Sequence, residues 1–250
     1  MRTHRLSPGT RKMLSALAST GAAVTLVAGL AGPASAQAVP PGPVDITQNA
    51  CPPDQVSKGT FGDVDGTSSA ALAINCIADY GITTGNASGG FNPTGTVTRA
   101  QMALFLSRLG ENFDTTPKGF TDIGGLSQEA QDAINGLYNA GVVNGTAGTS
   151  YSPANGVSRA QMASFLNRLE GAFENGESFT TSSDYFTDDN GLAADTQRDI
   201  NGITSVGIAA GTSGTNYSPT ATVSRQQMAY FLARTLEVSI RAGNSESAYG

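Results

Sequence analysis

One six-residue motif occurs three times in this chain and limits what the chain can fold into. It reads Val-Thr-Arg-Ala-Gln-Met at 97–102, Val-Ser-Arg-Ala-Gln-Met at 157–162 and Val-Ser-Arg-Gln-Gln-Met at 223–228. Self-similarity at a spacing of roughly 60 residues is the signature of a repeat architecture, in which one supersecondary unit is used several times. The sequence therefore predicts three copies of one structural unit.

Each copy of the motif has the features of a helix N-terminus. The Thr or Ser hydroxyl can accept from the amide three residues later, while the Gln side chain reaches back to the amide of the cap residue, which is a capping box. The preceding Val and the Met four residues into the helix are placed to form a hydrophobic staple. Apolar residues then continue at helical spacing, as in Met102, Phe105, Leu106 and Leu109. This stripe predicts a helix with one buried face.

A first helix is predicted ahead of each motif. Phe-x-Asp opens each unit, and glycine followed by an apolar residue closes the helix in the pattern of a Schellman cap. The three closing pairs are Gly81-Ile82, Gly141-Val142 and Gly207-Ile208. An aromatic residue then precedes a proline by two positions, at Phe91, Tyr151 and Tyr217. Because one such unit is too small to bury a core, we expect an all-α protein in which three helix-loop-helix repeats share one domain of about six helices.

The segments outside the repeats are predicted to differ in fate. Residues 1–36 have a basic start, an apolar middle and an Ala34-Ser35-Ala36 exit, which is typical of a signal peptide. Residues 37–60 are rich in proline and polar residues and are expected to be a linker or lead-in, while residues 237–250 are expected to be a disordered tail. We expect no transmembrane segment in the mature chain, because no second apolar run reaches bilayer length.

Two cysteines are present, Cys51 in the lead-in and Cys76 in the first repeat. In an exported chain two cysteines most simply pair, and closing this loop would stabilise the fold by roughly 3 kcal/mol. No Cys-x-x-Cys is present, so the sequence favours a structural disulfide over a redox role.

Composition narrows the function. The leader carries four of the 14 Lys and Arg residues, none of the 20 Asp and Glu, and the only histidine, so the mature chain would have a net charge of −10. Without histidine it offers neither a His-based nucleophile system nor a His-ligated zinc site, and we expect no catalytic residues, no metal and no cofactor. Its acidity disfavours nucleic acid as a partner. Asp63-x-Asp65-Gly66 and Asp188-Asp189-Asn190-Gly191 hint at calcium, but neither completes the twelve-residue loop pattern.

The order of these motifs resembles the S-layer homology repeat, with copies at 61–109, 120–169 and 186–236. The resemblance implies a pseudo-threefold bundle with one helix of each repeat at the centre and grooves between neighbouring repeats. It also implies a secreted, non-enzymatic protein anchored at the cell wall, whose grooves bind acidic wall polysaccharide, often pyruvylated. A protein-interaction or self-assembly module of a surface array, with other surface proteins as partners, is the alternative.

The candidate site residues are three arginines and three aspartates. The arginine of the family motif contacts ligand, and by position the resemblance carries this role to Arg99, Arg159 and Arg225. An arginine beside the free amides of a helix N-terminus could bind a carboxylate. In the opposite interpretation each arginine pairs with an acid of the protein, such as Asp63, Asp122 or Asp188. Chain departures from the family are the absence of tryptophan and a glutamine where its motif has glutamate.

Overall fold

The computed structural model describes residues 37–110, 113–172 and 177–247. It contains six helices: α1 (Ser69–Asp79), α2 (Arg99–Leu109), α3 (Gln128–Asn139), α4 (Arg159–Ala172), α5 (Ala194–Ser205) and α6 (Arg225–Ser247). The described residues form no strand, only isolated bridges between loops, so the all-α prediction is confirmed. The proposed signal peptide, residues 1–36, lies outside the described residues.

The three repeats meet at a ring of backbone hydrogen bonds. The valine that opens each motif donates its amide to the valine of another repeat: Val97 to Val223 at 3.0 Å, Val157 to Val97 at 2.9 Å and Val223 to Val157 at 2.9 Å. All three side chains are fully buried. This closed cycle places the starts of α2, α4 and α6 around a pseudo-threefold axis.

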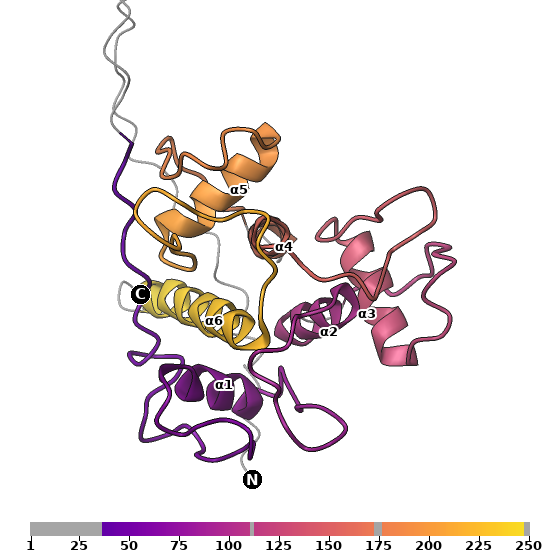
Figure 1. Ribbon diagram of the computed structural model, residues 1–250, viewed down its shortest axis with the longest axis horizontal. Helices are drawn as coiled ribbons and strands as arrows, with labels where there is room; N and C mark the ends of the chain where they lie inside the picture. Colours follow the sequence, from indigo (N-terminus) through magenta and orange to yellow (C-terminus); the bar gives the residue numbers. More distant parts are fainter. Residues whose placement is uncertain (1–36, 111–112, 173–176, 248–250) are drawn as a thin grey trace, which may run out of the picture.

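Helix packing follows the same cycle. The second helix of each repeat packs against the first helix of the next, so α2 contacts α3, α4 contacts α5, and α6 returns to contact α1 (Figure 1). The apolar stripes predicted from the sequence form one continuous core, with Met102, Met162 and Met228 completely buried. Each repeat therefore buries the apolar face of its second helix against the first helix of the next repeat.

The helix ends are those that the sequence predicts. Thr98, Ser158 and Ser224 each form a capping box with the glutamine three residues later. At the end of α1, Gly81 adopts a φ of 71°, while Ile82 donates to the Ile77 carbonyl at 2.9 Å in a Schellman motif. The same bonds recur after α3 and α5. Local sequence thus determines where these helices stop.

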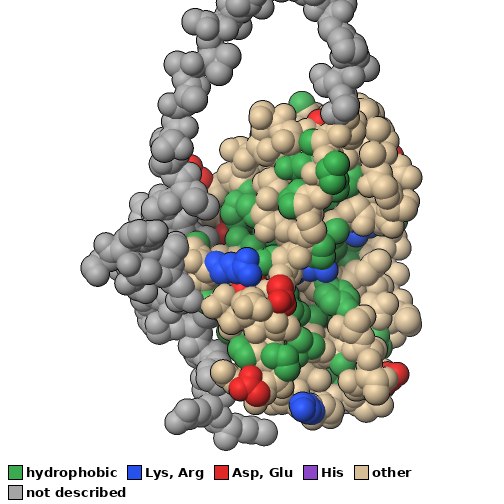
Figure 2. Space-filling model, turned by 90° about the vertical axis from the view of Figure 1, so that its left-hand side faces the viewer, with side chains coloured by type: hydrophobic (Ala, Val, Ile, Leu, Met, Phe, Trp, Pro, Cys, Tyr) green, Lys and Arg blue, Asp and Glu red, His purple; other side chains and the backbone are tan. Residues whose placement is uncertain are grey.

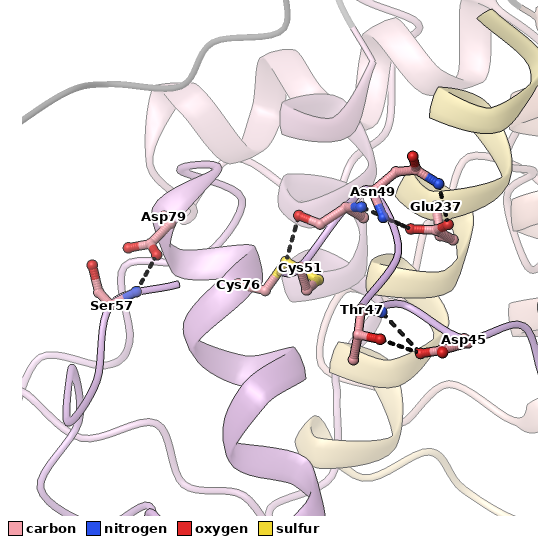
Figure 3. The surroundings of a disulfide bond; sticks show 9 residues. Asp45, Thr47, Asn49, Cys51, Ser57, Cys76, Asp79 and Glu237 are labelled. Carbon is pink, nitrogen blue, oxygen red and sulfur yellow. Dashed lines mark hydrogen bonds between the residues drawn. A yellow bond between two sulfur atoms is a disulfide. The ribbon is translucent and has the colours of Figure 1, made fainter. Parts of the chain in front are cut away.

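The lead-in forms a clasp between the first and last repeats. Cys51 and Cys76 form the expected disulfide, with 5.6 Å between their Cα atoms, which ties the lead-in to α1 (Figure 3). From α6, the buried Glu237 carboxylate accepts from the Asn49 amide at 3.0 Å, the Asn49 side chain at 2.7 Å and the Ala50 amide at 2.7 Å. The lead-in is thus bound covalently to the first repeat, through α1, and by hydrogen bonds to the last repeat, through α6.

The chain remains helical over most of the segment that was expected to be a disordered tail, residues 237–250. Helix α6 continues through the predicted boundary at residue 236 and ends at Ser247. The reason is tertiary: Glu237 holds the lead-in, and Val238 and Ile240 pack against the core. Residues 248–250 lie outside the described part of the chain.

The described residues contain no helix that could span a membrane, because none has the length and apolar character needed to cross a bilayer. The face drawn in Figure 2 has no strongly charged patch. Charged side chains on that face are few and scattered among uncharged ones (Figure 2).

Candidate functional site: the arginine interfaces

The three motif arginines lie at the boundaries between repeats. Each occupies the first position of a second helix and extends its side chain to the loop of the next repeat in the cycle. Arg99 reaches repeat 2, Arg159 reaches repeat 3 and Arg225 reaches repeat 1. All three are buried, with 4–6% of each residue exposed.

Arg99 and Arg159 make the same set of contacts. The Nε and Nη2 atoms of Arg99 donate to the Tyr151 carbonyl at 2.8 Å and the Asn144 carbonyl at 2.6 Å. Its guanidinium also lies 4.4 Å from the centre of the Tyr151 ring, at cation–π distance. Arg159 repeats this with Tyr217 and the Ala210 carbonyl, both at 2.8 Å, and lies 4.5 Å from the Tyr217 ring.

The tyrosine of each loop returns a hydrogen bond to the arginine that covers it. The Tyr151 hydroxyl donates to the Arg99 carbonyl at 3.2 Å, and the Tyr217 hydroxyl donates to the Arg159 carbonyl at 3.2 Å. Burial raises the pKa of Tyr151 to about 12, so this hydroxyl remains a donor. The two interfaces are therefore closed in both directions.

The amides at the helix N-termini are hydrogen-bonded, contrary to the expectation that they are free. The Arg99 amide donates to the Asn155 carbonyl at 2.9 Å, the Ala100 amide to the Pro153 carbonyl at 3.0 Å, and the third amide to the Thr98 cap. The α4 and α6 termini have equivalent bonds. The unpaired donors of the first turn are satisfied by the neighbouring repeat, so a ligand would have to bind another group.

The three aspartates hold the loops that the arginines contact. Asp63 accepts from the Phe91 and Asn92 amides, both at 2.7 Å, and Asp188 does the same with Tyr217 and Ser218 at 2.7 Å. Asp122 accepts from two amides and from the Ser150 hydroxyl at 2.5 Å. The Ser150 hydroxyl, with the two amides, lowers the pKa of Asp122 to about 2.

Aspartate and arginine therefore act through a shared loop residue. The Phe91 amide donates to Asp63 while its carbonyl accepts from Arg225. None of the ion pairs of the described residues joins a motif arginine to one of the three aspartates. The direct pairing considered from the sequence is absent at these positions.

Arg225 has fewer partners than its two counterparts. Its Nε donates to the Phe91 carbonyl, and its guanidinium lies 4.6 Å from the Phe91 ring. Its Nη2 atom is buried without a hydrogen-bond partner. Burial lowers the pKa of Arg225, and the charge of Asp63 acts in the opposite direction. Phenylalanine also supplies no hydroxyl here, so the interface between repeats 3 and 1 lacks two bonds that the others have.

The acidic stretches that suggested calcium gather no ligand set. Among the described residues, no three His, Cys, Asp or Glu side chains are grouped closely enough to hold a metal ion. Asp189, however, is fully buried and neither of its side-chain oxygens has a partner. Burial, reinforced by the charges of Asp184 and Asp188, raises its pKa to about 6. The other repeats have the apolar residues Val64 and Ile123 at the position of Asp189, and this difference is the sequence signal that marks Asp189 as a buried acid.

Comparisons with a family model and with individual proteins point to the same family. The S-layer homology domain family matches residues 60–103, 119–163 and 185–229, more than half of the chain. The chain is 31% identical over 169 residues to an S-layer protein of Bacillus thuringiensis subsp. finitimus, which covers 65% of this chain and 20% of that protein. It is 30% identical over 183 residues to S-layer protein EA1 of Bacillus anthracis, covering 70% and 20%.

An enzyme is also among the relatives. The chain is 26% identical over 177 residues to an endoglucanase of Bacillus sp. (strain KSM-635), covering 70% of this chain and 18% of that protein. The chain thus spans about a fifth of the length of these relatives. With three matched copies, each carrying the capped helix and the cross-repeat arginine, the chain belongs to the S-layer homology domain family.

Proposed function

We propose that the three repeats anchor this protein non-covalently to the cell envelope by binding an acidic wall polysaccharide beside Arg225. The protein is a secreted, cell-surface member of its family. The ligand is a sugar that carries a carboxylate, such as a pyruvyl group, because a guanidinium N–H donor recognises an oxyanion best. The proposal includes no catalytic step.

The observation that carries this proposal is the unused Nη2 of Arg225. An unpaired buried donor on a charged group is costly, so native proteins rarely leave one without a protein, water or ligand partner. The same nitrogen of Arg99 and of Arg159 donates to a carbonyl. The proposal therefore assigns ligand binding to Arg225 and to the loop held by Asp63. It assigns Arg99, Arg159, Asp122 and Asp188 to interface formation.

The relatives support anchoring rather than catalysis. The same repeat region aligns with proteins named for the S-layer and with one named an endoglucanase. A module shared by proteins of such different names is better suited to a common location than to a common reaction.

Sedimentation with purified cell-wall sacculi tests the proposal. Wild-type protein is expected to sediment with intact sacculi and to stay in solution after polysaccharide extraction or removal of acidic substituents. The Arg225→Gln variant is expected to bind at least about tenfold more weakly, because a charged hydrogen bond to the ligand is lost. Binding that survives polysaccharide extraction would contradict the proposal and support a protein-interaction module instead.

The matched control is Arg159→Gln. It removes an equivalent buried guanidinium and two carbonyl contacts, so it loses stability without losing a free donor. Assays are run below the melting temperature of the less stable variant, with helicity checked by circular dichroism. Equal loss of wall binding in both variants would show that Arg225 acts only through the fold.

A further inference from the structure

A hollow on the outer side of repeat 2 has features that the other repeats lack. Its volume is about 300 Å³, and it is lined by Lys118, Phe120, Tyr138 and the loop of residues 144–149. This volume is at the lower end of the range for small-molecule sites and suits one sugar unit. At the Lys118 position the other repeats have Gly59 and Asp184, and at the Tyr138 position they have Ala78 and Thr204.

The aromatic side of this hollow is rigid and partly open. Tyr138, at the end of α3, is 38% exposed, and among the described residues it is the only aromatic one that is not buried or partly buried. Its ring meets Phe120 edge-on at 5.2 Å between centroids. A sugar ring can stack on such an aromatic surface while the phenol hydroxyl exchanges hydrogen bonds with sugar hydroxyls.

The loop on the other side is held in place before any ligand arrives. The Thr146 amide donates to the Ser150 carbonyl at 2.8 Å, and the Thr121 amide donates to the Thr149 carbonyl at 3.0 Å. From the interface with repeat 1, Arg99 Nη2 holds the Asn144 carbonyl at 2.6 Å. Because this wall is already ordered, a ligand would lose little affinity to loop ordering.

Lys118 supplies a cation in an acidic protein. Its amide is fixed by the buried Asn135 side chain at 3.1 Å, and its side chain is exposed. No ion pair of the described residues involves it. The carboxylate of Asp114 interacts electrostatically with Lys118. Hydrogen bonds from Thr116 are the main cause of the lowered pKa of Asp114, and the charge of Lys118 lowers it further. Asp114 would therefore compete with an anionic ligand.

We infer that this hollow is a second saccharide site, separate from Arg225, which binds one sugar unit carrying a carboxylate. Tyr138 packs against the sugar ring, Lys118 pairs with the carboxylate, and the ordered loop offers backbone groups to the hydroxyls. The choice of a sugar as ligand rests on the proposed function. The location rests on the hollow itself.

Titration with methyl β-D-glucuronoside, followed by amide NMR of the secreted chain, tests the inference. Expected are shifts at Tyr138 and residues 144–149, with weaker binding of the neutral methyl β-D-glucoside. Lys118→Gln and Tyr138→Ala are each expected to weaken binding about tenfold, while Tyr138→Phe retains most of it. Asp114→Asn is expected to tighten binding, and Lys58→Gln, away from the hollow, is the matched control.

Two results would overturn the inference: shifts that map elsewhere, or unchanged affinity in both Lys118→Gln and Tyr138→Ala. The sacculus assay separates this site from the proposed function. If sedimentation depends on Arg225 while the hollow gives no shifts, the second site alone is wrong. If the glucuronoside binds the hollow while the protein does not sediment with sacculi, the anchoring proposal fails and the site stands.

Discussion

The interface between repeats 2 and 3 and the interface between repeats 3 and 1 use one motif in two ways. In the first, Arg159 donates to two carbonyls and receives the Tyr217 hydroxyl on its own carbonyl. In the second, Arg225 donates only to the Phe91 carbonyl, and no hydroxyl returns. The repeat that closes the cycle is therefore joined by fewer arginine contacts.

The lead-in compensates for this weaker closure. The 3–1 interface joins helices α1 and α6, which are the farthest apart in sequence, so its formation has the largest chain-entropy cost. The disulfide fixes the lead-in to α1, and Glu237 fixes the same segment to α6. A ring of repeats can therefore close with fewer arginine contacts when a separate segment holds its two ends together.

Removing the clasp at Glu237 should have the largest effect. Glu237→Ala leaves the buried Ala50 amide and the partly buried Asn49 amide without their acceptor, and it removes the partner of Arg241 at 2.9 Å. Loss of one partner from such a buried charged network costs about 3–5 kcal/mol of unfolding free energy. Urea unfolding followed by circular dichroism measures this. Glu177→Ala, at an exposed position, is the control; equal effects would show that the clasp contributes nothing special.

A second buried glutamate, Glu170, should make the free energy of unfolding depend on pH. Glu170, in α4, is almost completely buried, and burial raises its pKa to about 8 although the nearby Ser239 side chain acts in the opposite direction. The folded pKa exceeds the unfolded one, so the stabilisation is complete below the unfolded pKa and is lost as pH rises through 8. Asp189, with its pKa raised to about 6, acts in the same direction.

Unfolding free energies at pH 5 and pH 9 test this. Glu170 alone should account for a loss of about 3–4 kcal/mol over that range. Asp122 opposes it only in strong acid, because its folded pKa of about 2 means that its contribution is lost as pH falls through that value. Glu170→Gln should reduce the loss of stability between pH 5 and pH 9 to the part that Asp189 contributes, and an unchanged slope in this variant would contradict the assignment.

Opening the disulfide should weaken the closing interface more than the others. Replacing Cys51 and Cys76 by alanine releases a loop whose ends are 25 residues apart, which should cost about 3 kcal/mol. Hydrogen exchange should then rise in α1 and α6 before it rises in α4 and α5. Uniform exchange across all six helices would show that the lead-in stabilises the whole domain without favouring its closing interface.

Much of the fold could be predicted because its determinants are local. The capping boxes at Thr98, Ser158 and Ser224 need only residues three positions apart, and the glycine caps need only one turn of helix. Cys51 had one possible partner. The predicted helix-loop-helix repeats follow from these signals together with the apolar stripes.

The hydrogen-bond partners of the three motif arginines could not be predicted from the sequence. Arg99 binds carbonyls 45 and 52 residues away, and Arg225 reaches 134 residues back to Phe91. Every residue has a carbonyl, so such partners leave no mark in the sequence, whereas a carboxylate partner would have. Glu237 likewise accepts from backbone amides of the lead-in, which every residue other than proline has, so neither this contact nor the continuation of α6 could be predicted.

The smallest effect should come from exchanging the loop aromatic residues. Tyr217→Phe removes the hydroxyl that donates to the Arg159 carbonyl at 3.2 Å, so it should cost about 1 kcal/mol and make this interface resemble the closing one. Phe91→Tyr should add the equivalent bond to the Arg225 carbonyl and recover part of that amount, because Tyr151 and Tyr217 fit the same buried position in the other repeats. The double variant, measured by urea unfolding, should lie near wild type since the two sites are in different interfaces. If Phe91→Tyr instead destabilises the protein, the closing interface lacks room for the hydroxyl, and its missing bond reflects a tighter fit rather than a relaxed one.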